Sequence, residues 1–229
     1  MKPFSQLTSN ETIFGLIYFL LQLLVIPAIV VVVNMMFLQD AASEAVLNAI
    51  VFAINFVAVL IIFRKFLRND LRFLVRAPWF VLRWTGIGFL IYMAGNTVVS
   101  LIITIIDPGF ANINDASIME MVQDNYGLMV LCTVVLVPIV EECFYRVLLF
   151  RNLYDRYPAV AYIVSMVVFG LAHVVAYIGT ESFGTLMLCF LQYLPAGFAL
   201  AFAYRRSGSI FASVLIHMTV NQIGMLAMR

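Results

Sequence analysis

Two adjacent glutamates and an arginine stand in the apolar stretch VPIVEECFYRVLLFR, residues 137–151. Inside a bilayer each charge would cost at least about 2.5 kcal/mol, so three together need compensation or a purpose. Glu142 and Arg146 are four residues apart, which places them on one helix face and allows a charge-assisted ion pair that supports the helix. Glu141 points about 100° away from its neighbour and has no partner in its own helix. An unpaired carboxylate at membrane depth indicates a functional site.

The chain has only two histidines, and both lie in apolar stretches. His173 is in VVFGLAHVVAY and His217 is in SVLIHMTVNQ. Because neither histidine is used at the surface, we expect the two to share a site rather than to be separate packing residues. Asn221 follows His217 by four residues, and Phe169 precedes His173 by four, so each shares a helix face with its histidine. Asn221 could equally join two helices by a hydrogen bond, and packing is the better interpretation of Phe169.

A carboxylate, two imidazoles and an amide are suited to hydrolysis by an activated water. The carboxylate would take a proton from the water, one imidazole would orient or share it, and the amide with the second imidazole would stabilise an oxyanion. Glu141, His173 and His217 also form a known catalytic zinc ligand set, with a fourth position left for water. No cofactor is certain, and the sequence leaves zinc open.

A bundle of membrane helices must position these groups. Of the 229 residues, 64% are hydrophobic and 11% charged, against roughly 45–50% and 25% in soluble domains. Since the lipid cannot satisfy backbone groups and no barrel pattern occurs, we expect an all-α, polytopic transmembrane helical bundle. Seven apolar runs are long enough to cross a membrane, at about residues 13–37, 46–66, 86–106, 127–150, 159–178, 183–204 and 208–228.

Positive charge predicts the orientation of the bundle. All of the 13 lysine and arginine residues except Arg146 and Arg229 fall on one side of the expected topology. Since basic residues avoid translocated loops, we expect the N-terminus in the cytoplasm and the C-terminus outside. Residues 64–84 interleave basic residues with Phe, Leu and Trp, which predicts a cytoplasmic interfacial amphipathic helix, and Ala77-Pro78 is expected to turn the chain.

The chain divides into two parts of a single membrane domain. Residues 1–106 hold N-terminal transmembrane helices and the interfacial segment, and residues 127–229 hold the candidate catalytic core. We expect the lipid bilayer and a membrane-associated peptide or protein as partners, and no nucleic acid.

Three motifs resemble those of the CAAX-processing and bacteriocin-processing intramembrane protease family, which includes the type II CAAX prenyl endopeptidases. The family carries EExxxR, FxxxH and HxxxN on separate helices in that order. This chain has EECFYR from Glu141, FGLAH ending at His173, and HMTVN from His217. The resemblance covers the C-terminal helices and says little about the first three.

The resemblance implies an intramembrane endopeptidase, and it assigns roles to the motif residues. It implies that Glu141 and His173 activate the water, and that His217 and Asn221 form the oxyanion site. It also implies that Glu142 and Arg146 hold the helix geometry. Whether such enzymes are metalloproteases or use a metal-free, glutamate-activated mechanism stays open.

The eukaryotic members have eight spans, so an additional half-helix is conceivable in this chain. The short loops and compact chain resemble a prokaryotic member, for which bacteriocin immunity or processing of a membrane-associated peptide is expected rather than CAAX prenyl processing. Two alternatives remain. One is a non-catalytic immunity or scaffold protein that retains the fold, and the other is a proton-coupled carrier that uses a Glu/His relay. The absence of an evident internal repeat speaks against the carrier.

Overall fold

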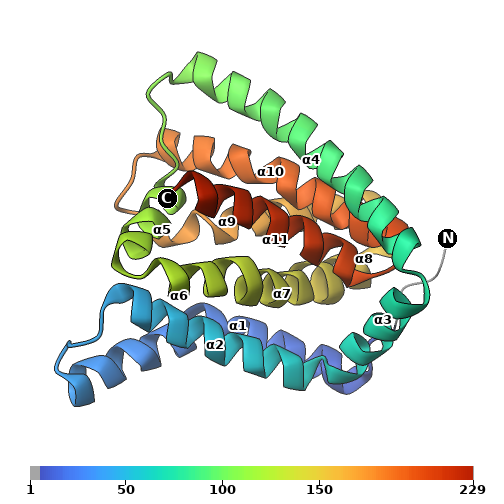
Figure 1. Cartoon of the computed structure of the whole chain (residues 1–229), viewed down its shortest axis with the longest axis horizontal. Coiled ribbons are helices and arrows are strands. Elements are labelled where there is room, and N and C mark those ends of the chain that lie inside the picture. Colours follow the sequence, from blue (N-terminus) through green and yellow to red (C-terminus); the bar gives the residue numbers. More distant parts are fainter. Residues whose placement is uncertain (1–5, 229) are drawn as a thin grey trace.

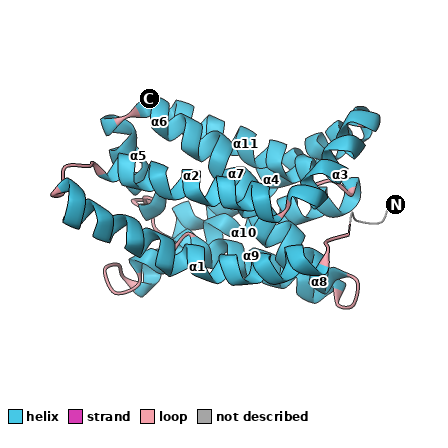
Figure 2. Ribbon diagram, turned by 90° about the horizontal axis from the view of Figure 1, so that it is seen from below, coloured by secondary structure: helices cyan, strands magenta, loops and turns pink. Residues whose placement is uncertain are grey.

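The computed structural model describes residues 6–228, and these form an all-α helical bundle (Figure 1). Within this range there is no β-strand beyond an isolated bridge between Ile178 and Glu181, and loops are short links between helices (Figure 2). The main helices are α1 Ser9–Val33, α2 Glu44–Ile62, α3 Arg64–Arg76, α4 Pro78–Ile106, α5 Ile113–Asp124, α9 Pro158–Ala172, α10 Phe183–Ser207 and α11 Ile210–Ala227. A further continuous helical run contains α6 Tyr126–Val130, α7 Val137–Glu142 and α8 Arg151–Tyr154. The polytopic helical fold expected from the sequence is confirmed.

Six helical segments of the described chain are long and apolar enough to cross a membrane. They are Ser9–Phe37, Glu44–Ile62, Pro78–Ile106, Tyr126–Tyr154, Phe183–Ser207 and Ile210–Ala227. The beginning of α1, α3, α8 and the turn between α10 and α11 lie at one end of the bundle, with α5 and the end of α11 at the other (Figure 1). The segments richest in lysine and arginine therefore share one end, as the expected topology requires.

The helix in the region of the expected span at 159–178 is shorter than the sequence predicts. Helix α9 has only 15 residues and ends at Ala172. His173 Nδ1 lies 2.8 Å from the carbonyl oxygen of Phe169, the acceptor that the His173 N–H would use in a regular α-helix. That N–H donates to Gly170 instead, and a short 3₁₀ turn follows at Val175–Tyr177. Competition from the side chain thus coincides with the end of the helix.

Within the expected interfacial segment at 64–84, the helix ends at the turn that was expected at Ala77 and Pro78. Helix α3 stops at Arg76 because Ala77, the residue before Pro78, adopts a non-helical conformation with φ −139° and ψ 54°. Pro78 then begins α4, as a proline in the first turn can, and residues 78–84 form the start of that span.

Two buried carboxylates fix α3 against its neighbours. Glu11 on α1 accepts a hydrogen bond from the backbone N–H of Phe66 at 2.8 Å. Asp70 Oδ2 accepts from the Ser209 hydroxyl at 2.7 Å and from the Ile210 N–H at 2.9 Å, and so caps the start of α11. Helix α3 is therefore bonded to both α1 and α11.

The helical run Tyr126–Tyr154 is the most deeply packed membrane segment of the described chain. Half of the residues in its most apolar window are buried, against 6% for the corresponding windows of α1 and α4. It contacts α11, α9, α1 and α2. Because this run carries Glu141 and Glu142, the two carboxylates lie in the interior of the bundle rather than on its lipid-facing surface.

Candidate active site

The helix that carries the two glutamates widens on both sides of them. Residues Leu131–Leu136 and Cys143–Phe150 are π-helical, and α7 lies between them. Pro138 has no N–H and its ring would clash with the carbonyl four residues back, which gives a local cause for the first wide stretch. There the Val137 N–H donates to the Cys132 carbonyl, five residues back. Such wide turns are frequent at functional sites.

The expected ion pair between Glu142 and Arg146 is present and fully buried. Arg146 Nε lies 3.0 Å from Glu142 Oε2, and neither side chain is exposed. Arg146 Nη1 also donates to the Ser165 hydroxyl on α9 at 2.6 Å, and its guanidinium lies 5.0 Å from the centre of the Phe169 ring. The pair therefore joins its helix to α9 as well as bridging one turn.

His217 lies between the two glutamates. Its Nδ1 is 3.3 Å from Glu142 Oε1, and its Nε2 is 3.8 Å from Glu141 Oε2. Because the Glu142 carboxylate is paired with Arg146 and can only accept, Nδ1 is the donor. The sequence predicted Glu142 as a partner of Arg146 alone, and the structure shows that it also orients His217.

The Glu141 carboxylate differs from that of Glu142 in its hydrogen bonding. Its side chain is 20% exposed, and atom Oε2 is buried and accepts no hydrogen bond from any residue in the described part of the chain. At 3.8 Å the contact with His217 Nε2 is too long for a direct hydrogen bond. One oxygen atom could lie within hydrogen-bond distance of both.

His173 is held from the backbone and from one ring face. Since the Phe169 carbonyl oxygen is only an acceptor, His173 Nδ1 must donate across their 2.8 Å contact. In the neutral imidazole this leaves Nε2 as the basic nitrogen. The ring stacks on Tyr193 of α10, with 4.1 Å between centroids and 23° between planes.

The Phe169 ring contacts both histidines. Its centroid is 4.7 Å from that of His173 and 5.7 Å from that of His217. Tyr145 packs edge-on against the same ring at 5.5 Å. Phe169 thus forms an apolar wall that both imidazoles share, which agrees with the packing role expected for it.

Asn221 on α11 contacts the helical run Tyr126–Tyr154. Its Nδ2 donates to the Thr133 carbonyl oxygen at 2.7 Å, within the first wide stretch. This is the interhelical bond that the sequence left open as an alternative. Only one of its two amide hydrogens is needed for that bond, so an oxyanion role stays a prediction.

The zinc interpretation gains no support from the arrangement of side chains. Among the described residues, no group of three or more His, Cys, Asp and Glu side chains is placed to hold a metal ion. Glu141 and His217 lie together, but His173 is joined instead to Phe169 and Tyr193. We therefore assign no step to a metal.

A second polar cluster lies beside His173, and the sequence analysis missed it. Residues 107–125 lie between the expected spans at 86–106 and 127–150, and they contain α5, capped by Asn112. The cluster joins α5 to α10 and consists of Asn112, Asn114, Asp115, Gln192 and Tyr193. Burial raises the pKa of the Asp115 carboxyl, and His173 and the Tyr193 hydroxyl partly offset that rise. The polar run NIND was the only signal in the sequence.

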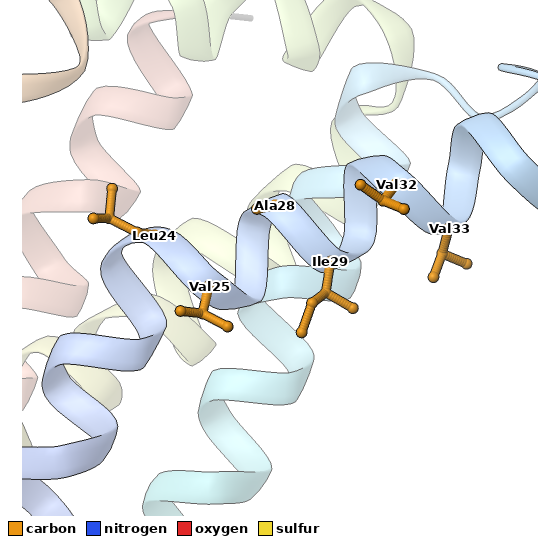
Figure 3. Close-up of a pocket in the computed structure, with 6 residues that line it drawn as sticks. All are labelled: Leu24, Val25, Ala28, Ile29, Val32 and Val33. Atoms are coloured by element: carbon orange, nitrogen blue, oxygen red, sulfur yellow. The ribbon is translucent and has the colours of Figure 1, made fainter.

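A shallow apolar groove runs along α1, and it contains none of the polar residues described above (Figure 3). Its six lining residues are Leu24, Val25, Ala28, Ile29, Val32 and Val33. They follow one side of the helix next to Pro27, which lies inside α1. A groove of this composition on a membrane-spanning helix is suited to lipid chains and carries no chemistry.

Comparison with known families concerns the region that contains the site. Residues 123–223, a little under half of the chain, match the model of a family described as type II CAAX prenyl endopeptidase Rce1-like. Over these residues the chain is similar to that family. The Rce1-like region contains all three motifs, which confirms the resemblance noted from the sequence and supports an enzymatic role in general. With its apolar helices, the chain is an integral, multi-pass membrane protein. No curated protein and no solved structure matches the chain.

Proposed function

We propose that the chain is an intramembrane endopeptidase that hydrolyses a peptide bond of a membrane-associated peptide or protein by an activated water. The observation that carries this proposal is the pairing of Glu141 Oε2, which has no hydrogen-bond donor in the described chain, with His217 Nε2 at 3.8 Å. Because no donor of the described chain is bonded to this oxygen, it is available to accept a hydrogen bond from a water and then its proton. The similarity of residues 123–223 to an endopeptidase family supports the same reaction.

In the proposed reaction Glu141 takes a proton from water while the water oxygen forms a bond to the substrate carbonyl carbon. The carbonyl π electrons move to its oxygen, which becomes the oxyanion of a tetrahedral intermediate. When that intermediate collapses, the C–N bond breaks and the proton passes from Glu141 to the leaving amine. The carboxylate is regenerated, and the products are a carboxylic acid and an amine.

The other motif residues have distinct parts in this proposal. His173 presents Nε2 as its basic nitrogen, so it can accept a hydrogen bond from the attacking water. His217 donates its Nδ1–H to Glu142, so it stabilises the oxyanion through Nε2 as the doubly protonated imidazolium, and Asn221 does so through its second amide hydrogen. Arg146 holds Glu142 in place through their ion pair.

The proposed setting is a cell membrane of the prokaryotic type, with the N-terminus in the cytoplasm and the C-terminus outside. The short loops leave little room outside the bilayer for a soluble substrate-binding domain. A substrate that already lies in the membrane reaches the site by lateral diffusion. We therefore propose a membrane-associated peptide or protein as substrate.

Glu141→Gln tests the proposal directly. The full chain is placed in lipid nanodiscs with a library of quenched fluorescent peptides that carry a lipid anchor, and products formed in H₂¹⁸O are analysed by mass spectrometry. Hydrolysis by the wild type places one ¹⁸O in the new carboxyl terminus. We expect Glu141→Gln to lower the rate at least about 100-fold without lowering the unfolding temperature.

Glu44→Gln, which changes an exposed glutamate at the start of α2, is the matched control and should cleave like the wild type. Equal cleavage by Glu141→Gln and the wild type would remove Glu141 from the reaction. Loss of folded protein in Glu141→Gln would show that its carboxylate is structural. Partner binding that survives the substitution, without any cleavage, would favour a scaffold or immunity protein.

A further inference from the structure

The hydroxyl of Tyr193 is held by the N-terminal turn of α5. Asn114 Nδ2 donates to it at 3.1 Å, and it donates in turn to Asn112 Oδ1 at 3.3 Å. Asn112 Nδ2 also donates to Gln192 Oε1 at 2.8 Å, so two adjacent residues of α10 are bonded to one cap residue of α5. The position of the Tyr193 side chain is therefore determined at its polar end.

The other end of Tyr193 determines the position of an imidazole. The phenol ring stacks face to face on His173, with 4.1 Å between centroids and 23° between planes. His173 follows the last residue of α9, where the chain leaves the helix, so the helix backbone beyond it gives no support. Its ring is held by the Phe169 carbonyl, by the Phe169 ring and by Tyr193.

Asp115 belongs to the same polar cluster. It lies in the first turn of α5, and burial raises the pKa of its carboxyl, which the nearby His173 and the Tyr193 hydroxyl partly offset.

We propose that Tyr193 is a positioning residue for His173, fixed by Asn112 and Asn114. The inference rests on the proposed function, since it takes His173 to be a residue of the active site. Stacking sets the plane of the ring, and the bond from Nδ1 to Phe169 sets its rotation. Together they direct Nε2 to one place.

Two variants separate the contribution of the Tyr193 hydroxyl from that of its ring. Tyr193→Phe keeps the stacked ring and removes the hydroxyl, whereas Tyr193→Leu removes the ring that covers His173. Because small displacements of a catalytic group reduce rates strongly, we expect Tyr193→Leu to lower kcat about 100-fold and Tyr193→Phe about tenfold, with KM unchanged. Tyr157→Phe, which changes an exposed tyrosine, should leave kcat unchanged.

The imidazoles provide a measurement that does not depend on catalysis. The chain has only two histidines, so ¹⁵N-histidine labelling gives two ring spin systems, and the His217→Gln variant assigns them. We expect Tyr193→Leu to shift the His173 ring nitrogen signals and to leave those of His217 in place. Unchanged His173 signals in Tyr193→Leu would overturn the inference whether or not the chain is a protease.

The unfolding temperature of Tyr193→Leu distinguishes positioning from stability. We expect kcat to fall while the protein stays folded at the assay temperature. A fall in kcat that only follows a loss of folded protein would mean a structural role and overturn the inference. Normal kcat in Tyr193→Leu, beside inactive Glu141→Gln, would overturn it while the proposed function stands.

Discussion

The two histidines of the site are held in opposite ways. His217 is 6% exposed, and each of its ring nitrogens faces a carboxylate, Glu142 at Nδ1 and Glu141 at Nε2. His173 is half-buried, and its neighbours are a backbone carbonyl and two aromatic rings. His217 is thus fixed by charge in the core, and His173 by shape at the end of a helix.

This difference predicts which histidine can be replaced without loss of stability. Removing a group that satisfies a buried carboxylate leaves that carboxylate unpaired, which destabilises the folded state. Removing a ring that only stacks and bonds to a carbonyl at a helix end has a smaller effect on stability. We therefore expect His173 to affect activity alone and His217 to affect both activity and stability.

The largest expected effect comes from the two alanine variants of the histidines. His173→Ala should lower the rate of cleavage about 100- to 10,000-fold with little change in the unfolding temperature. His217→Ala should lower the rate similarly and also reduce the free energy of unfolding by about 1–3 kcal/mol, because Glu142 Oε1 loses its donor. Cleavage assays and thermal unfolding in detergent measure the two quantities. Equal destabilisation by both variants would contradict the comparison.

Arg146→Met should give the largest loss of stability. It leaves the Glu142 carboxylate without its cation in the core, which costs about 3–5 kcal/mol when one partner of a buried pair is removed. Because Glu142 orients His217, cleavage should fall as well. Arg156→Met, at an exposed arginine, is the control and should change stability by less than about 0.5 kcal/mol. Denaturant titration of both variants measures their free energies of unfolding. Similar values would show that the buried pair contributes little.

Ser165→Ala extends the test to the connection between helices. The hydroxyl accepts from Arg146 Nη1 at 2.6 Å, so its loss leaves a buried charged donor unsatisfied. We expect a destabilisation of about 1–3 kcal/mol, smaller than that of Arg146→Met, with a modest effect on kcat. A loss of activity as large as that of His217→Ala would mean that Ser165 takes part in the reaction itself.

Asp70→Ala should have the smallest effect, and it should affect His217 but not His173. It removes the acceptor for Ser209 and Ile210 at the start of α11, which is worth about 0.5–2 kcal/mol for a capping interaction. Since α11 carries His217, the ring nitrogen signals of His217 should shift, while those of His173 should not. A shift confined to His173 would show that the two regions are coupled differently.

Much of the fold was predictable because the composition of a segment is enough to identify a membrane helix. Long apolar runs identified the spans, and the pattern of basic residues predicted which loops share an end of the bundle. The ends of helices were less predictable, except where a proline marks them. Helix α3 stops at Ala77 before a proline, as expected, whereas α9 stops where His173 bonds to Phe169. The end of α9 depends on a side-chain conformation that the sequence pattern does not contain.

The sequence predicted which residues form the site, but it did not predict the contacts between distant ones. Spacing of four residues correctly predicted the pair of Glu142 with Arg146, since one helix turn determines that contact. The bond from His217 to Glu142 joins residues 75 positions apart, and the bond from Asn114 to Tyr193 joins residues 79 apart. No local pattern reports such contacts. Asp115 was missed for this reason.

The sequence by itself determined that this chain is a helical membrane protein, and that its interior contains a carboxylate, two imidazoles and an amide in three spaced motifs. These properties depend on composition and on neighbours within one or two helical turns. Only the tertiary structure decided that both glutamates face the same imidazole, and that α5 lies beside the other one through Tyr193. Such contacts depend on how each helix is rotated and where it ends. Those are set by packing between distant segments, because each helix alone leaves its rotation undetermined.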